Sequence, residues 1–208
     1  NDNTITNDSA TVTVSVTDAS SDDNFDPLAD KTVAVTCTND DAAGFTVSSI
    51  SGNTTEAGGN ATFTVKLTAQ PSADVTVGLS SDDTTEGTVS PASLTFTTVN
   101  WNSNQTVTVT GADDALADGN ITYHIVTAAA TSVDANYNGV NPSDVTVVNT
   151  DDDLPGFTIS AISGHTTEAG ATATFTVKLN TAPTADVTIG ISSDDTTEGT
   201  VSPASLTF

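Results

Sequence analysis

The chain has 208 residues, of which 27 are acidic and only 3 are basic, so its formal net charge is -24. Such a charge repels nucleic acid and anionic membrane surfaces, and no stretch is long and apolar enough to insert into a membrane. We therefore expect no nucleic-acid partner and no membrane insertion, and the charge favours cations as ligands.

Apolar and polar residues alternate in short runs along the chain, and no segment has a helical period. Phe63, Val65 and Leu67, for example, alternate with threonine and lysine, which predicts a strand with one buried face. Within 44–155 the predicted strands are 45–49, 61–68, 74–80, 92–98, 104–111, 120–130 and 143–150. Disorder is the alternative for so polar a chain, but a disordered chain has no reason to keep this alternation. Seven short strands separated by turn residues predict an all-β, immunoglobulin-like antiparallel sandwich.

The sequence repeats itself, because residues 44–96 and 156–208 are identical at roughly four-fifths of their positions. Gly44 corresponds to Gly156, and this spacing defines one repeat. We interpret 44–155 as a complete repeat, 1–43 as the C-terminal part of another, and 156–208 as the N-terminal part of a third. The prediction is a piece of a longer array of sandwiches in tandem. An alternative is that 1–43 and 156–208 of different chains complete one domain, although together they lack a counterpart of 97–112.

Acidic residues are concentrated in the loops at one end of the predicted sandwich. An antiparallel chain brings the loops after the first, third and fifth strands together with the exit from the seventh strand. Ten of the thirteen acids in 44–155 occupy these segments: Glu56, Asp82, Asp83, Glu86, Asp113, Asp114, Asp118, Asp151, Asp152 and Asp153. Crowded carboxylates repel each other, and a hard divalent cation with six to eight oxygen ligands removes that penalty. Ca²⁺ is therefore the expected cofactor, and a solvated acidic surface is the alternative.

Three segments also carry a family resemblance: TTEAGGNATFTVKL, DDALADGN and TDDDLPGF. The chain resembles the Calx-β family, whose sandwich domains occur in sodium–calcium exchangers, in an integrin subunit, and in tandem in large bacterial surface proteins. The resemblance implies a set of calcium ligands: Glu56, Asp82 or Asp83, Asp113, Asp114, Asp118, and Asp151 to Asp153.

The flanking segments carry parts of equivalent sites. These candidate ligands are Asp2, Asp8, Asp40 and Asp41 before the complete repeat, and Glu168, Asp194 and Asp195 after it. Asp151 to Asp153 directly precede the start of the next repeat, so an ion held there would stiffen the joint between two domains. The expected partners are neighbouring repeats of the same chain and other copies in a fibre.

The most favoured function is a structural or adhesive array on the outside of a cell, with Ca²⁺ stiffening each joint. No arrangement of serine, histidine and acid indicates an enzyme: His165 stands where the other copy has Asn53, and His124 lies within a strand. A carbohydrate- or protein-binding module with Trp101 as its anchor is one alternative, although a lone tryptophan beside a strand is more often part of a core. A calcium sensor is another.

Overall fold

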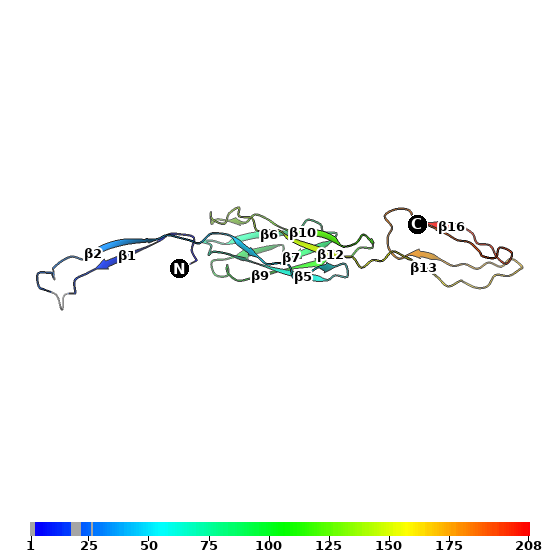
Figure 1. Cartoon of the computed structure of the whole chain (residues 1–208), viewed down its shortest axis with the longest axis horizontal. Helices are drawn as coiled ribbons and strands as arrows, with labels where there is room; N and C mark the ends of the chain where they lie inside the picture. Colours follow the sequence, from blue (N-terminus) through cyan, green and yellow to red (C-terminus); the bar gives the residue numbers. More distant parts are fainter. Residues whose placement is uncertain (1–2, 18–21, 26) are drawn as a thin grey trace.

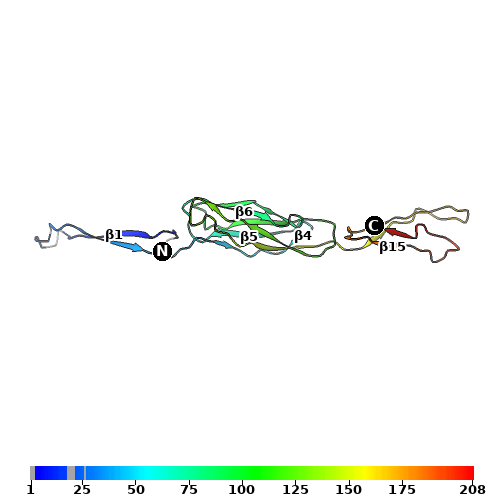
Figure 2. The same cartoon turned by 90° about the horizontal axis from the view of Figure 1, so that it is seen from above.

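The structure is a computed structural model that describes residues 3–17, 22–25 and 27–208. Its described residues form strands, turns and loops and no helix, which confirms the predicted all-β fold. Three parts follow one another along the long axis: a hairpin, a sandwich and a pair of open two-stranded sheets (Figures 1 and 2). Within the described residues there is no helix with the length and hydropathy needed to cross a membrane.

The first part is a hairpin of two antiparallel strands, β1 (Asp8–Val14) and β2 (Lys31–Cys37). Every position of the two strands is exposed to solvent. Cys37, the only cysteine, is free and exposed at the end of β2.

Residues 44–155 form the middle part, which we call the central sandwich. Its strands are β3 (Phe45–Val47), β4 (Thr54–Thr55), β5 (Asn60–Leu67), β6 (Val75–Ser81), β7 (Gly87–Ser90), β8 (Ser93–Phe96), β9 (Gln105–Gly111), β10 (Ile121–Thr127), β11 (Thr131–Ser132) and β12 (Val145–Thr150). Each predicted run overlaps one of the strands, although β5 begins one residue before its predicted run and β6 ends one residue after its own. The short strands β4, β7 and β11 were not predicted.

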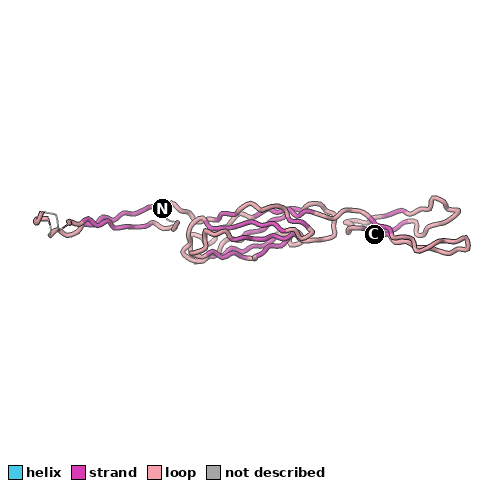
Figure 3. The backbone as a smooth tube through the Cα atoms, turned by 90° about the horizontal axis from the view of Figure 1, so that it is seen from below, coloured by secondary structure: helices cyan, strands magenta, loops and turns pink. Residues whose placement is uncertain are grey.

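Two sheets face each other in the central sandwich. One has four strands in the order β3-β5-β9-β7, and the other has six, β11-β6-β10-β12-β4 with β8 paired to β6. Figure 3 shows the strands of this part in magenta, with loops at both ends. Pairing is antiparallel except between β12 and β4, which run parallel, contrary to the predicted fully antiparallel arrangement. The central sandwich has more strands than the seven predicted, and the segment 87–96 accounts for part of this difference. It contains two strands, because β7 pairs with β9 in the four-stranded sheet whereas β8 pairs with β6 in the six-stranded sheet.

One hydrophobic core lies between these two sheets. The alternation predicted for β5 is confirmed, since Phe63, Val65 and Leu67 are buried and the residues between them are only half-buried. Tyr137 packs edge-on against Phe45 from the loop that follows β11, with 6.0 Å between ring centroids. Trp101 is also part of this core.

The last part contains β13 (Phe157–Ile159) paired with β14 (Val177–Leu179), and β15 (Thr188–Gly190) paired with β16 (Ser205–Thr207). Its sequence nearly repeats that of 44–96, yet its side chains are far less covered. Phe63 is 1% exposed, whereas Phe175, its counterpart one repeat later, is 37% exposed. The same sequence is therefore buried only where β9 completes its own sheet and β10 and β12 complete the facing one.

The same backbone contact joins consecutive parts of the chain twice. Thr4 forms a parallel bridge with Gln70, and Leu116 forms one with Ala182. In the first, the Gln70 N–H donates to the Asn3 carbonyl at 2.8 Å; in the second, the Ala182 N–H donates to the Ala115 carbonyl at 2.6 Å. Both residues of the second bridge lie one repeat after those of the first, so the two joints have the same construction.

Candidate metal centre

Two groups of three carboxylates lie at one end of the central sandwich. The first is Glu56, Asp151 and Asp153, and the second is Glu86, Asp114 and Asp118; within each group the ligand oxygens lie within 4.8 Å of one another. We call them the first and second acidic clusters. Both draw their members from loops far apart in sequence, as the predicted topology required.

Pairing between β4 and β12 builds the first cluster. Thr55 lies opposite Thr150, and the Glu56 N–H donates to the Thr150 carbonyl at 3.1 Å. This contact sets Glu56 beside the acidic segment that follows β12. The Asp152 N–H donates to the Glu56 carboxylate at 3.3 Å.

Burial makes the charge on Glu56 costly. Its side chain is 2% exposed. Desolvation raises the pKa of Glu56 to about 6, and repulsion from Asp151, Asp114 and Asp118 adds to the rise. All the charged neighbours that shift the pKa of Glu56 are therefore carboxylates, and none of them is a cation.

Asp153 contributes an oxygen with no protein partner. Its Oδ2 atom is inaccessible to solvent and accepts no hydrogen bond. Desolvation raises the pKa of Asp153, followed by repulsion from Asp151, Asp152, Asp113 and Asp114. Buried oxygens are normally satisfied, so an unpartnered carboxylate oxygen inside an acidic cluster fits a missing cation ligand.

The remaining member of the first cluster, Asp151, is held in place by the backbone. Its Oδ2 accepts the Gly119 N–H at 2.7 Å, and its Oδ1 accepts the Asp153 N–H at 2.7 Å. Gly119 has a φ of 83°, a conformation that glycine adopts without strain. The bond from Gly119 connects the first cluster to the loop that carries the second.

The second cluster is centred on Glu86, whose side chain is buried. Desolvation raises its pKa, and repulsion from Asp118, Asp83 and Asp114 acts in the same direction. The Asn149 side-chain amide donates to Glu86 at 3.4 Å and to the Ala112 carbonyl at 3.0 Å. Thr54 donates to the Asn149 carbonyl oxygen at 3.0 Å, so a buried polar network lies under both clusters.

Some of the predicted ligands lie outside both clusters. Asp82 accepts two hydrogen bonds from His124, one from its N–H at 2.6 Å and one from Nδ1 at 3.0 Å, and the backbone bond is the main reason its pKa is lowered. Asp83 accepts the Thr85 N–H within its own turn. Asp113 and Asp152 are exposed, and the charge of each repels Asp153; Asp152 also donates its backbone N–H to Glu56.

Sequence reasoning counted Glu86 among the clustered acids but did not include it among the ligands. Glu86 could have been recognised as a ligand from its place in the loop after β6, shortly beyond Asp82. In the structure Glu86 belongs to a cluster, whereas both aspartates of that loop lie outside the clusters. In the flanking parts, Asp40, Asp41, Glu168, Asp194 and Asp195 join no group of three among the described residues, and Asp2 lies outside those residues. Asp8 pairs with Cys37 at the end of the hairpin.

The clusters offer only carboxylate oxygens, with no histidine or cysteine in either. Oxygen ligands suit Ca²⁺ and Mg²⁺, whereas zinc prefers nitrogen and sulfur. The residues present therefore fit a hard divalent cation. No family model matches this chain, and no curated protein matches it.

Proposed function

We propose that the chain is a segment of a structural or adhesive array on the cell surface, in which Ca²⁺ stiffens the joints between immunoglobulin-like sandwiches. The observation that carries this proposal is the first acidic cluster, where buried Glu56 lies beside the unpartnered Oδ2 atom of Asp153. Carboxylates in this arrangement repel each other, and a divalent cation turns the repulsion into attraction.

Ca²⁺ is favoured over Mg²⁺ because of how the ligands are held. They come from loops with irregular geometry, and Ca²⁺ accepts six to eight oxygens in flexible arrangements, whereas Mg²⁺ demands a near-ideal octahedron. The Calx-β resemblance of the three sequence segments supports the same ion, the sandwich fold and a surface location.

The position of the clusters supports a role at the joint. Asp114 and Asp118 flank Leu116, the residue that bridges to Ala182 in the next part of the chain. An ion that binds both aspartates would fix the loop between them, and with it the contact to the next unit. Without the ion, repulsion in the same loop would loosen that contact.

The burial of Trp101 disfavours the alternative of a sugar-binding module. Its side chain is 9% exposed and packs in the hydrophobic core, which leaves little of the ring free to stack on a sugar.

Calorimetric titration with Ca²⁺ tests the proposal. We expect binding with a Kd of about 10⁻⁴–10⁻³ M, the range of extracellular modules, rather than the ~10⁻⁷–10⁻⁵ M of sensors. Asp153→Asn should weaken binding at least tenfold because it neutralises the buried oxygen. Asp74→Asn, the same change on an exposed residue outside both clusters, should leave binding unaltered. Absence of Ca²⁺ binding by the unaltered chain, or equal binding by the Asp153 variant, would contradict the proposal.

A further inference from the structure

The two joints of the chain share one backbone bridge but differ in the side chains beside it. We call the bridge from Thr4 to Gln70 the first joint and the bridge from Leu116 to Ala182 the second joint. The loop that starts at the bridge reads TITN at the first joint and LADGN at the second. The backbone bridge tolerates these differences, so each joint can be stabilised further by side chains of its own.

At the first joint an isoleucine packs next to the bridge. Ile5 directly follows Thr4, is partly buried, and packs against the hydrophobic core of the central sandwich. The core that receives it is the one enclosed between the two sheets of 44–155. Burial of apolar surface is favourable without any bound ion. The contact of Ile5 therefore stabilises the first joint by itself.

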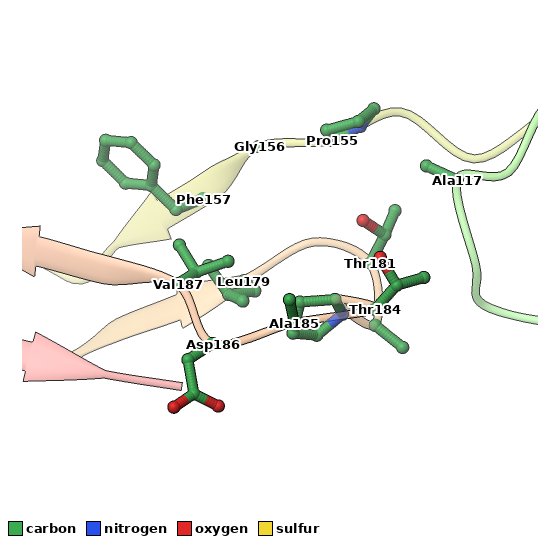
Figure 4. A pocket seen from close by; sticks show the side chains of 12 residues that line it. Ala117, Pro155, Gly156, Phe157, Leu179, Thr181, Thr184, Ala185, Asp186 and Val187 are labelled. Carbon is green, nitrogen blue, oxygen red and sulfur yellow. The ribbon is translucent and has the colours of Figure 1, made fainter.

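The second joint has only a methyl group at the corresponding position. Ala117 lies one repeat after Ile5, and Figure 4 shows it on the loop that faces Thr181 in the next part. Leu116 does not replace the isoleucine, because it stands at the position of Thr4 and successive side chains of an extended segment point to opposite sides. An alanine buries less apolar surface than an isoleucine, so this position contributes less to the second joint.

The loop of the first joint also lacks an aspartate. Asn7 accepts the Asn39 N–H at 2.8 Å. Asn120 accepts the Asp151 N–H at 3.1 Å in the same way, so the two asparagines occupy equivalent places. Between the bridge and this asparagine the first joint has the residues IT, whereas the second joint has ADG. Asp118, a member of the second cluster, therefore has no carboxylate counterpart at the first joint.

A member of the first cluster is replaced as well, because Asn39 stands where the second joint has Asp151. The Asn39 Oδ1 accepts the Asp41 N–H at 2.9 Å, the same contact that Asp151 makes with Asp153. Where Asp151 has a second carboxylate oxygen, Asn39 has an amide group that donates to the Asp41 carbonyl at 2.9 Å. An amide nitrogen of this kind is a donor and does not coordinate a cation. The turn at Asn39 is thus closed by its own hydrogen bonds.

A third replacement concerns the amide that lies under the second cluster. The Asn149 side chain donates to Glu86 at 3.4 Å, and its counterpart at the first joint is Cys37, whose thiol is only a weak donor. Thr6, Cys37 and Asn39 lie together at the end of the hairpin. The features that build the acidic clusters are therefore replaced together at the joint where the isoleucine packs.

We infer that the two joints are stabilised by different means: the apolar contact of Ile5 maintains the first joint without a cation, whereas the second joint depends on a cation bound by the acidic clusters. The second half of this inference rests on the proposed function, and the first half does not. An array with both kinds of joint loosens at some joints and not at others when the Ca²⁺ concentration falls.

Distance distributions between two spin labels test the apolar contact at the first joint. The labels are placed at two exposed positions, Thr11→Cys in the hairpin and Asn104→Cys in the central sandwich, after Cys37→Ser removes the only native cysteine. Ile5→Ala should broaden the distribution equally with Ca²⁺ and in chelator, whereas Ile5→Leu, which keeps an apolar side chain of the same size, should not. Val99→Ala is the matched control, because it shortens a valine that is 85% exposed.

The cation-dependent half is tested across the second joint, with labels on Asn104→Cys and on Lys178→Cys in β14, in the same cysteine-free background. Ca²⁺ should narrow this distribution when the joint is unaltered. The double variant Asp118→Thr with Asp151→Asn, which introduces the residue types of the first joint, should lose the narrowing. Asp74→Asn, a change at an exposed acid outside both clusters, should keep it.

The outcomes separate this inference from the proposed function. Absence of narrowing by Ca²⁺ in the unaltered second joint would contradict both. Narrowing that persists in the double variant would overturn the inference alone. An Ile5→Ala distribution that is unchanged, or that broadens only in chelator, would also overturn the inference alone. The fluorescence of Trp101, the only tryptophan, reports that the central sandwich stays folded in every variant.

Discussion

Leu116 and Ala182 form a parallel backbone bridge between the central sandwich and the part that follows it. The Ala182 N–H is the donor of the hydrogen bond across this joint, and Thr4 and Gln70 form the same bridge one repeat earlier. A contact made by the backbone does not depend on particular side chains. The same bridge can therefore recur although one copy has a glutamine, Gln70, where the other has an alanine, Ala182.

Ala182→Pro should loosen the second joint, because proline has no N–H to donate. We expect a broader distribution of distances between spin labels placed in the central sandwich and in the last part of the chain. Ala182→Ser keeps the N–H and serves as the control. An unchanged distribution for the proline variant would show that the bridge does not determine the geometry of the joint.

Glu56→Gln should have opposite effects with and without Ca²⁺. In chelator the variant should be more stable than the unaltered chain, because a buried charge is replaced by a neutral amide that still accepts the Asp152 N–H. With Ca²⁺ it should gain less stability, since it lacks one charged ligand. Thermal unfolding followed by Trp101 fluorescence measures both effects. Destabilisation in chelator would contradict the unfavourable charge assigned to Glu56.

The pH dependence of stability follows from the raised pKa of Glu56. The folded-state pKa of about 6 lies above the ordinary value of 4.5, so the folded protein holds this proton more tightly than the unfolded chain does. In chelator, stability should therefore fall as the pH rises from 4.5 through 6, by up to about 2 kcal/mol. Glu86 and Asp153, whose pKa values are also raised, act in the same direction.

Denaturant unfolding in chelator at a series of pH values checks this loss. Glu56→Gln should reduce the dependence of stability on pH between 4.5 and 6, because it removes the titrating group. Saturating Ca²⁺ should also reduce this dependence, since a bound cation stabilises the ionised form of Glu56. A stability that rises through the same pH window would reverse the assigned sign.

Asn149 connects the core to the second cluster, and its counterpart in the hairpin is Cys37. Asn149→Cys removes its bonds to Glu86 and Ala112 and the acceptor for Thr54. The variant should lose about 1–3 kcal/mol of stability, because buried polar groups remain unpaired. Asn104→Cys, at an exposed position, is the control, and both are measured by denaturant unfolding in reducing buffer. Equal stability of the two variants would exclude a structural role for the buried network.

The sequence by itself determined the all-β fold and the positions of the longer strands. Alternation of the type seen in Phe63, Val65 and Leu67 is a local property, because successive side chains of a strand point to opposite faces. The sequence also determined that acids gather at one end, since chain reversal between strands brings alternate loops together. Glu56, Asp151 and Asp153 were identified as neighbours on that basis, and they are neighbours in the structure.

Only the tertiary structure decided which acids share a cluster and which sequence is buried. Glu86 joins Asp114 and Asp118, whereas Asp82 pairs with His124, and nothing local in the loop distinguishes these two acids. Distances between loop side chains depend on long-range pairing, such as the parallel contact that brings Thr54 to Asn149 from a distant part of the chain. Phe63 and Phe175 stand in identical FTVKL segments, and one is buried while the other is not. Burial is a property of the partner layer, which a strand's own sequence does not contain.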